Sequence, residues 1–173
     1  MRVSRVYAAG GESIAEFYLQ KRIPLNLEKI PLKVREAFIV SEDQDFYHHH
    51  GWSVESIIRA IWTNLRSGYI KQGGSTITQQ VIKSLAVGKE KSYKRKIKEA
   101  MLSYLLEKSL TKDQILEIYL NEIYLGSGAY GVAAAGQVYF GKPASGLNLA
   151  QSCLIAGLAK APGRDSPLIN YKR

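Results

Sequence analysis

Carboxylates and histidines gather in one short stretch of the sequence, S-E-D-Q-D-F-Y-H-H-H-G-W, at residues 41–52. The run before it, 31–40, begins with proline and repeats apolar residues at helical spacing, so it predicts a helix. Glu42, Asp43 and Asp45 then fall at or just past its C-terminus. There the negative helix pole costs about 0.3 to 1 kcal/mol for each carboxylate, and stability alone would favour Lys or Arg. A carboxylate kept in this position suits a general base, although a solvated polar loop is the alternative.

The chain is strongly basic, with 24 Lys and Arg against 15 Asp and Glu, a formal net charge of +9 and a sequence pI near 9.6. This balance favours an anionic partner, such as nucleic acid, an acidic membrane surface or a phosphorylated substrate. At 173 residues the chain suits one domain with a sizeable core, and 46% hydrophobic residues exclude wholesale disorder.

The single cysteine, Cys153, and the hydropathy leave the cellular compartment open. One cysteine excludes an internal disulfide, and its place in the apolar run 149–158 predicts a buried, inert thiol. No stretch approaches the roughly 20 apolar residues of a membrane span, and no signal-peptide pattern follows Met1. Either the protein is cytosolic or its targeting segment is absent from this chain.

A glycine-rich segment, 73–74, precedes a predicted helix with polar residues on one side. We expect Ser75 to cap this helix, which would run to about Ala86. The polar stripe consists of Thr76, Gln80 and Lys83, and the apolar stripe consists of Ile77, Val81 and Leu85. Amides freed by glycines at a helix N-terminus can bind an anion, but most Gly-Gly-Ser turns are ordinary caps.

The chain becomes strongly basic from Lys89, and within this basic run we expect a long helix to start at Ser92. Arg95 and Glu99 stand one turn apart on this helix. The apolar residues expected to pack inward are Ile97, Met101, Tyr104 and Leu105. Such a charge run is usually a solvated face or a nonspecific nucleic-acid patch, but the embedded Glu99 argues against phosphate binding alone.

Helical patterns also dominate the rest of the chain, which predicts a mainly α fold. Capping boxes begin two further helices, at Thr111 with Gln114 and at Asn148 with Gln151. The other expected elements are an extended segment over 1–23 with at most a short strand or hairpin, a helix over 54–68 capped by Ser53, a small-residue helix over 132–140 and a tail or linker over 163–173. The apolar stripe of 54–68 fits a core, and part of it also fits an interfacial patch for lipid.

Five motifs in this order closely resemble the signature motifs of the peptidoglycan glycosyltransferases, glycosyltransferase family 51. They are E-D-x-x-F-x-x-H-x-G at Glu42–Gly51, G-G-S-T-I-T-Q-Q-x-x-K at Gly73–Lys83, R-K-I-K-E at Arg95–Glu99, I-L-E-I-Y-L-N at Ile115–Asn121 and A-G-L-x-K-A-P at Ala156–Pro162. The match covers nearly the whole chain. The N-terminal segments also resemble the start of this domain in class A penicillin-binding proteins.

The resemblance implies one glycosyltransferase domain over 1–173, a lysozyme-like helical domain with a smaller membrane-proximal lobe. It implies polymerisation of lipid II onto a growing glycan chain, with inversion and release of undecaprenyl pyrophosphate, at the outer face of the bacterial cytoplasmic membrane. Relatives carry an N-terminal membrane anchor, and class A proteins add a transpeptidase domain. We therefore expect this chain to be an excised catalytic domain that contacts the membrane surface, binds moenomycin-type inhibitors and does not bind nucleic acid.

The resemblance also implies roles for individual residues. Glu42 matches the catalytic base that takes the proton of the acceptor 4-hydroxyl. Glu99 matches the second catalytic carboxylate, assigned either to assisting pyrophosphate departure or to positioning cations and substrate. The positions that match substrate-binding or supporting residues are Asp43, Phe46, His49, Ser75, Thr76, Gln80, Lys83, Arg95 and Lys96. Fixed cations among them would stabilise the charge that builds on the departing pyrophosphate.

No cofactor is expected to be obligatory. The resemblance implies that a divalent cation, Mg²⁺ or Mn²⁺, could assist pyrophosphate departure, as it does in some relatives. The three consecutive histidines, 48–50, do not share a face and make a poor ligand set, so we expect no structural metal site.

Two other functions remain as alternatives. A lysozyme-like hydrolase or lytic transglycosylase on the same fold would also centre on a glutamate, but it would have no need of the cations Lys83, Arg95 and Lys96. A non-catalytic module for a membrane or nucleic acid would account for the positive charge alone, and its function would survive Glu42→Gln.

Overall fold

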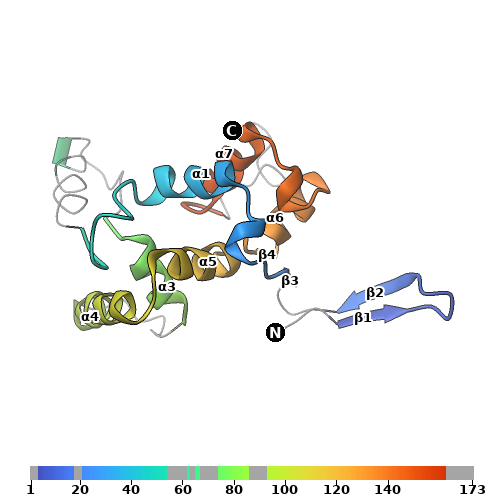
Figure 1. The fold of residues 1–173 in the computed structure, drawn as a ribbon, viewed down its shortest axis with the longest axis horizontal. Helices are drawn as coiled ribbons and strands as arrows, with labels where there is room; N and C mark the ends of the chain where they lie inside the picture. The colour runs from blue at the N-terminus through green and yellow to red at the C-terminus, as the bar shows by residue number, and fades with distance from the viewer. Residues whose placement is uncertain are drawn as a thin grey trace. The chain divides into compact units, whose positions relative to one another are not determined.

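The computed structural model describes residues 4–17, 21–53, 62, 65–66, 74–85 and 93–162 (Figure 1). Its fold is mainly helical, as expected from the sequence, with only short strands. The chain divides into two compact units, one formed by 1–37 with 120–173 and the other by 38–119. Most of the helix expected over 54–68, the end expected for the helix after Ser75 and the tail expected over 163–173 lie outside the described residues.

The N-terminal segment of the first unit forms the expected hairpin. Strands β1 (Ser4–Tyr7) and β2 (Ser13–Phe17) pair antiparallel, and Gly11 in the turn between them has a φ of +85°. A parallel pair of two-residue strands, β3 (Lys21–Arg22) with β4 (Ala129–Tyr130), was not expected from the sequence. So short a pair has no periodicity to detect, because its partners are brought together by the fold.

Two helices of the first unit begin or end at the residues that their sequences predict. Helix α6 (Val132–Phe140) stops at Gly141, whose φ of +61° is the left-handed conformation typical of a helix C-terminus. Helix α7 (Leu149–Leu158) begins with a capping box in which the backbone amides of Asn148 and Gln151 bond to each other's side chains at 3.0 and 2.9 Å.

The prediction that the thiol of Cys153 is buried is wrong, because this residue is exposed on α7. The buried residues of this helix are Ser152, Ile155, Ala156 and Leu158, and they leave Cys153 on the opposite side. An apolar run longer than the buried stripe does not indicate which of its residues face the core.

The second unit holds the end of α1 (Leu32–Glu42), helices α3 (Ile77–Leu85) and α4 (Tyr93–Ser109), and the first eight residues of α5 (Lys112–Glu122). Its core residues include Phe38, Phe46, Ile77, Val81, Ile115, Leu116 and Tyr119. The rings of Phe38 and Tyr119 meet edge to face with centroids 6.0 Å apart. Helix α5 begins with the predicted capping box of Thr111 and Gln114, whose two bonds measure 2.8 and 3.3 Å.

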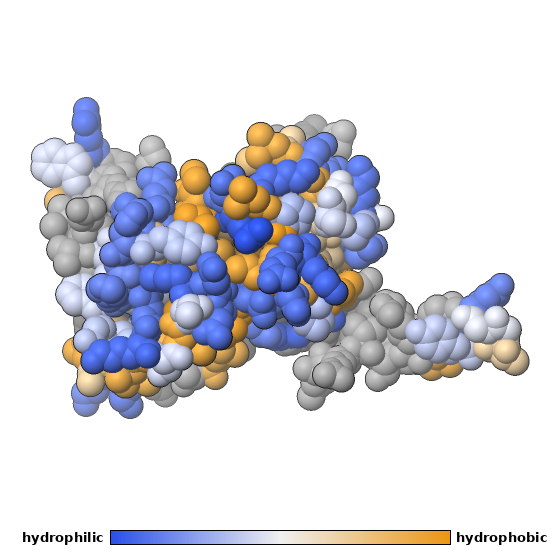
Figure 2. Space-filling model, viewed as in Figure 1, coloured by the Kyte–Doolittle hydropathy of each residue, from blue (hydrophilic) through white to orange (hydrophobic). Residues whose placement is uncertain are grey.

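Helix α4 is oriented opposite to the prediction from its apolar residues. Its exposed residues include Ile97, Met101, Tyr104 and Leu105, whereas Glu99 and Ser103 are buried. The buried stripe is polar because Glu99 accepts cationic side chains and Ser103 Oγ bonds to the backbone of Glu99 at 2.7 Å. Hydrophobic residues gather on the surface of the second unit where α4 lies (Figure 2).

The N-cap of α3 is Thr76, one residue later than predicted. The backbone amide of Thr76 donates to Gln79 Oε1, and Thr76 Oγ1 accepts from the amide of Gln79, both at 3.2 Å. This reciprocal pair is a capping box, which Ser75 does not form. Leu85, expected on the apolar stripe of this helix, is exposed.

None of the helices within the described ranges is long and apolar enough to cross a membrane.

Candidate functional site

Glu42 is the last residue of α1, and the chain turns away from the helix directly after it. Gln80 on α3 donates a hydrogen bond from Nε2 to Glu42 Oε2 at 2.8 Å. The other carboxylate oxygen, Oε1, is buried and has no hydrogen-bond partner within the described part of the chain. Glu42 is therefore held by one oxygen and keeps the other for a proton or a ligand.

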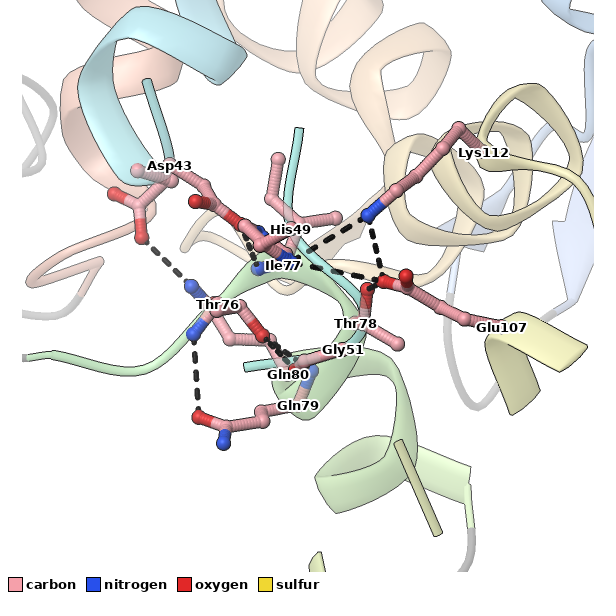
Figure 3. Close-up of polar contacts among 11 residues, drawn as sticks. Asp43, His49, Gly51, Thr76, Ile77, Thr78, Gln79, Gln80, Glu107 and Lys112 are labelled. Carbon is pink, nitrogen blue, oxygen red and sulfur yellow. Dashed lines mark hydrogen bonds and ion pairs between the residues drawn. The ribbon is translucent and has the colours of Figure 1, made fainter. Parts of the chain in front are cut away.

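Asp43 links the loop after α1 to the N-terminus of α3. Asp43 is 4% exposed, and its Oδ2 accepts the backbone amide of Ile77 at 3.0 Å. The same oxygen lies 2.9 Å from Nε2 of His49 (Figure 3). A carboxylate at a helix N-terminus is stabilised by the helix dipole, so Asp43 fixes how α3 meets the loop that follows Glu42.

Phe46 and His49 both lie in the loop that follows α1. Phe46 is fully buried, and its ring meets that of His49 with centroids 6.2 Å apart. Lys112 places its ammonium group over the Phe46 ring, 4.6 Å from the centroid. Phe46 therefore packs against the site residues without a polar group of its own, and its contribution is to hold them in place.

Thr76 fastens α3 to the same loop, because its Oγ1 donates to the backbone carbonyl of Gly51 at 2.7 Å. Gly51 has a φ of +87°, and a Cβ there would lie 2.8 Å from the carbonyl carbon of Ser103. Only glycine fits a position with this conformation and this approach of α4.

Glu99 is the centre of a second group of predicted site residues. It is 2% exposed and receives Lys96 Nζ at 2.5 Å and Arg95 Nη1 at 3.6 Å. Lys96 Nζ also donates to Ser75 Oγ at 2.9 Å. The structure thus brings Ser75, Arg95, Lys96 and Glu99 together, with one buried carboxylate holding two cations.

Lys83, predicted to be a third cation of the site, lies exposed in the last turn of α3. Within the described part of the chain it forms no hydrogen bond or ion pair with either the Glu42 or the Glu99 group.

Sequence reasoning missed several polar groups beside the site, namely the buried Thr78, the buried side chain of Glu107, the half-buried Lys112 and the buried hydroxyl of Tyr119. Glu107 Oε1 accepts from Thr78 Oγ1 at 2.5 Å and from Lys112 Nζ at 2.8 Å (Figure 3). A signal did exist for the charged pair, because Glu107 lies near the C-terminus of α4 and Lys112 is the first residue of α5. Each charge opposes the dipole of its own helix.

Burial raises the pKa of Tyr119 well above 10.0, and the negative charges of Glu42 and Asp43 raise it further. The Tyr119 hydroxyl is buried without a hydrogen-bond partner within the described residues. It therefore stays protonated and lies within electrostatic range of both carboxylates.

The described residues do not include a group of three or more His, Cys, Asp or Glu side chains that could hold a metal ion. Glu99 is occupied by Lys96 and Arg95, which compete with a cation for its oxygens. The protein side chains in the described part therefore do not provide a complete ligand set for Mg²⁺ or Mn²⁺.

A family model described as Transglycosylase matches residues 10–173. The chain belongs to the transglycosylase family. This confirms the family recognised from the motifs, and with it the class of enzyme, a glycosyltransferase of peptidoglycan synthesis.

The relatives of this transglycosylase chain include penicillin-binding proteins 1A from three bacteria. Identity is 47% over 169 residues for Pseudomonas aeruginosa, 47% over 172 residues for Aquifex aeolicus and 48% over 169 residues for Escherichia coli K12, covering 98%, 99% and 98% of the chain. The chain spans only 21%, 24% and 20% of the length of these relatives.

A crystal structure of penicillin-binding protein 1A from Haemophilus influenzae is similar to the transglycosylase chain, with a TM-score of 0.50 and 28% sequence identity. The similarity covers 99% of this chain and 16% of that one.

Proposed function

We propose that this chain polymerises lipid II into glycan strands, with Glu42 as the general base. Glu42 Oε1 would remove the proton of the acceptor sugar's 4-hydroxyl as that oxygen attacks the anomeric carbon of the donor. The bond from the anomeric carbon to undecaprenyl pyrophosphate breaks, and the configuration inverts. The observation that carries this assignment is the anchoring of Glu42 through Oε2 to Gln80, which leaves Oε1 buried and unengaged within the described residues.

The contacts of Glu99 favour a role in positioning cations over a direct role in the departure of the pyrophosphate. Its buried carboxylate already holds Lys96 at 2.5 Å and Arg95 at 3.6 Å. Cations held in place before the reaction stabilise the developing charge of the leaving pyrophosphate without having to reorganise. Asp43, Phe46 and His49 support the loop of Glu42, and Ser75 orients Lys96.

We propose no obligatory cofactor. The donor's pyrophosphate oxygens would have to supply most ligands of a divalent cation, because the described side chains do not form a set of three. No step of the mechanism is assigned to such an ion.

The proposed place of action is the outer face of the bacterial cytoplasmic membrane, where the lipid-linked donor and the growing glycan chain would meet the enzyme. The net charge of +9 suits an anionic lipid surface, and the second unit exposes Trp62, Leu65 and Leu85 at 68%, 75% and 59%. Binding of moenomycin-type phosphoglycolipids and a linked transpeptidase domain belong to the same proposal. Nucleic acid is not a proposed partner.

Glycan polymerisation from labelled lipid II in detergent tests the proposal. We expect polymer from the wild-type chain and none from Glu42→Gln, with lipid II binding retained by both. Glu36→Gln is the matched control, because Glu36 is exposed on the same helix and should leave polymerisation unchanged. Equal polymer from Glu42→Gln would overturn the base assignment. Release of fragments from finished glycan without lipid II would instead support a lytic enzyme.

A further inference from the structure

Glu107 joins three side chains from different segments of the second unit. Its Oε1 accepts from Thr78 on α3 and from Lys112 on α5, at 2.5 and 2.8 Å, and lies 3.9 Å from Nδ1 of His49. The Glu107 side chain is 5% exposed and that of Lys112 is 19% exposed. The proposed chemistry uses neither residue, although the Glu107 side chain is buried and both contact His49 in the loop that follows Glu42.

The Glu107–Lys112 pair is placed against the local helix dipoles. Glu107 lies in the last turn of α4, where carbonyl groups concentrate negative charge, and Lys112 begins α5, where amide groups concentrate positive charge. Exchanging the two charges would suit both helices better. In the present order the cation is the nearer of the two groups to the His49 ring, since Lys112 Nζ lies 3.5 Å from Nδ1 and Glu107 Oε1 lies 3.9 Å from it.

The neighbours of the His49 ring select one arrangement of its protons. Asp43 Oδ2 lies 2.9 Å from Nε2 and can only accept, so Nε2 carries a proton. Lys112 Nζ can only donate, so Nδ1 must offer its lone pair. The Nε2–H form of the ring satisfies both contacts at once.

We propose that Glu107 and Lys112 are positioning residues for Glu42. They affect the orientation of Glu42 indirectly, through contacts with His49, Asp43 and α3. This inference rests on the proposed function, because it assigns them a part in orienting the general base.

The connection runs through contacts of the second unit. Lys112 holds His49 as the Nε2–H form, and His49 then donates to Asp43. Asp43 receives the amide of Ile77 at the start of α3. One turn further along α3, Gln80 donates to Glu42 at 2.8 Å. Glu107 completes the arrangement from the other side, because it neutralises Lys112 and binds Thr78 on the same turn of α3.

The test combines two measurements on the 173-residue chain. The nitrogen-15 chemical shifts of the His49 ring report which nitrogen carries a proton, and they need no substrate. Kinetics of lipid II polymerisation separate kcat from KM. The variants are Lys112→Met, Lys112→Arg, Glu107→Gln and the double variant Glu107→Gln with Lys112→Met.

Lys108→Met is the matched control. Lys108 also lies over an aromatic ring, 4.7 Å from the centroid of Tyr104, but it is exposed and has no part in the His49 contacts. It should keep the wild-type ring signals and the wild-type kcat.

We expect the wild-type chain to show His49 protonated only at Nε2. In Lys112→Met, the Glu107 carboxylate has lost its cation, faces Nδ1 and should draw a proton onto it. We expect kcat to fall about tenfold to a hundredfold, with little change in KM. Lys112→Arg should retain the Nε2–H form and most of the activity. In the double variant Nδ1 should lose the proton again, because the carboxylate that attracts it is gone.

Unchanged ring protonation in Lys112→Met, or a kcat equal to that of the wild type, would overturn the positioning role. A loss of kcat that the ring signals do not accompany would also overturn it, since a general weakening of the fold would then suffice. If Lys112→Met does not fold, Lys112→Leu replaces it, because it also removes the cation and leaves the Glu107 carboxylate facing Nδ1. Absence of polymerisation by the wild-type chain would refute the proposed function, whereas the ring signals would still test the contacts of His49.

Discussion

Gln80 donates a hydrogen bond from its side-chain amide to Oε2 of Glu42 at 2.8 Å, so the proposed base is held by a neighbouring helix. The residues lie 38 positions apart in the sequence, and the bond joins the end of α1 to α3. Its consequence is that the direction in which Glu42 points depends on how α3 is placed.

The first prediction concerns Gln80. Replacing it with Met keeps the length of the side chain and removes the donor, so Glu42 should lose its fixed orientation. We expect kcat for lipid II polymerisation to fall about tenfold to a hundredfold, with KM changed less, as steady-state kinetics would measure. Gln114→Met is the control, because Gln114 only caps α5. Wild-type kcat in Gln80→Met would show that this hydrogen bond does not orient the base.

The second prediction concerns Glu99 and its cations. Glu99→Gln removes the charge that holds Lys96 and Arg95, and they should then be poorly placed for the leaving pyrophosphate. We expect kcat to fall on the order of a hundredfold, measured at saturating lipid II. Glu28→Gln, at an exposed position of the first unit, should have no effect. A rise in KM alone would instead assign Glu99 to substrate binding.

The third prediction concerns Gly51. An alanine there would adopt a strained φ of +87° and bring its Cβ to 2.8 Å from the backbone of Ser103. We expect Gly51→Ala to lower the free energy of unfolding by about 2 to 5 kcal/mol, measured by denaturant titration.

Gly141 provides the comparison for this variant. Its φ of +61° is also left-handed, but nothing lies within 4 Å of a Cβ built on it. Gly141→Ala should therefore cost only the backbone term, about 1 to 2 kcal/mol. Equal losses for the two variants would mean that the Ser103 backbone moves away from the added Cβ without lowering the free energy of unfolding.

The fourth prediction concerns the dependence of stability on alkaline pH. The pKa of Tyr119 is raised well above 10.0 by burial and by Glu42 and Asp43, whereas an unfolded tyrosine ionises near 10. The contribution of Tyr119 to stability is therefore complete below about pH 10 and is lost as the pH rises further towards the folded pKa. Relative to Tyr119→Phe, the wild type should lose about 1.4 kcal/mol per pH unit above that point.

Denaturant titrations of the wild type and Tyr119→Phe between pH 7 and pH 11 would measure this difference. At neutral pH the variant should be as stable as the wild type or more so, because it removes a buried hydroxyl without a partner among the described residues. A constant difference across the whole range would contradict the raised pKa.

Local features of the fold could be predicted from the sequence. The capping boxes at Thr111 and Asn148 and the glycine stop at Gly141 lie where predicted. Each depends on residues three or four positions apart, whose interaction the helical geometry settles without the rest of the chain. The position of Glu42 at the end of α1 follows for the same reason.

Features that depend on distant partners were missed or mistaken. The apolar side of α4 is exposed, because the polar residues Glu99 and Ser103 face the interior of the second unit. Periodicity identifies the two sides of a helix but does not indicate which side is buried. The contact of Glu107 with Thr78 joins residues 29 positions apart, and no local pattern marks such a pair.

The sequence by itself determined the family and the helical segments, because motifs and caps are local and each can be read within one turn or loop. It also named Glu42 and Glu99 as the carboxylates to consider. Only the tertiary structure decided that Gln80 holds Glu42, that Glu99 is buried beside Lys96 and Arg95 of its own helix, and that a Glu107–Lys112 pair contacts His49. The burial of Glu99 and the contacts of Glu42 and His49 exist only after segments distant in the sequence pack together, and burial and distance set the strength of polar contacts.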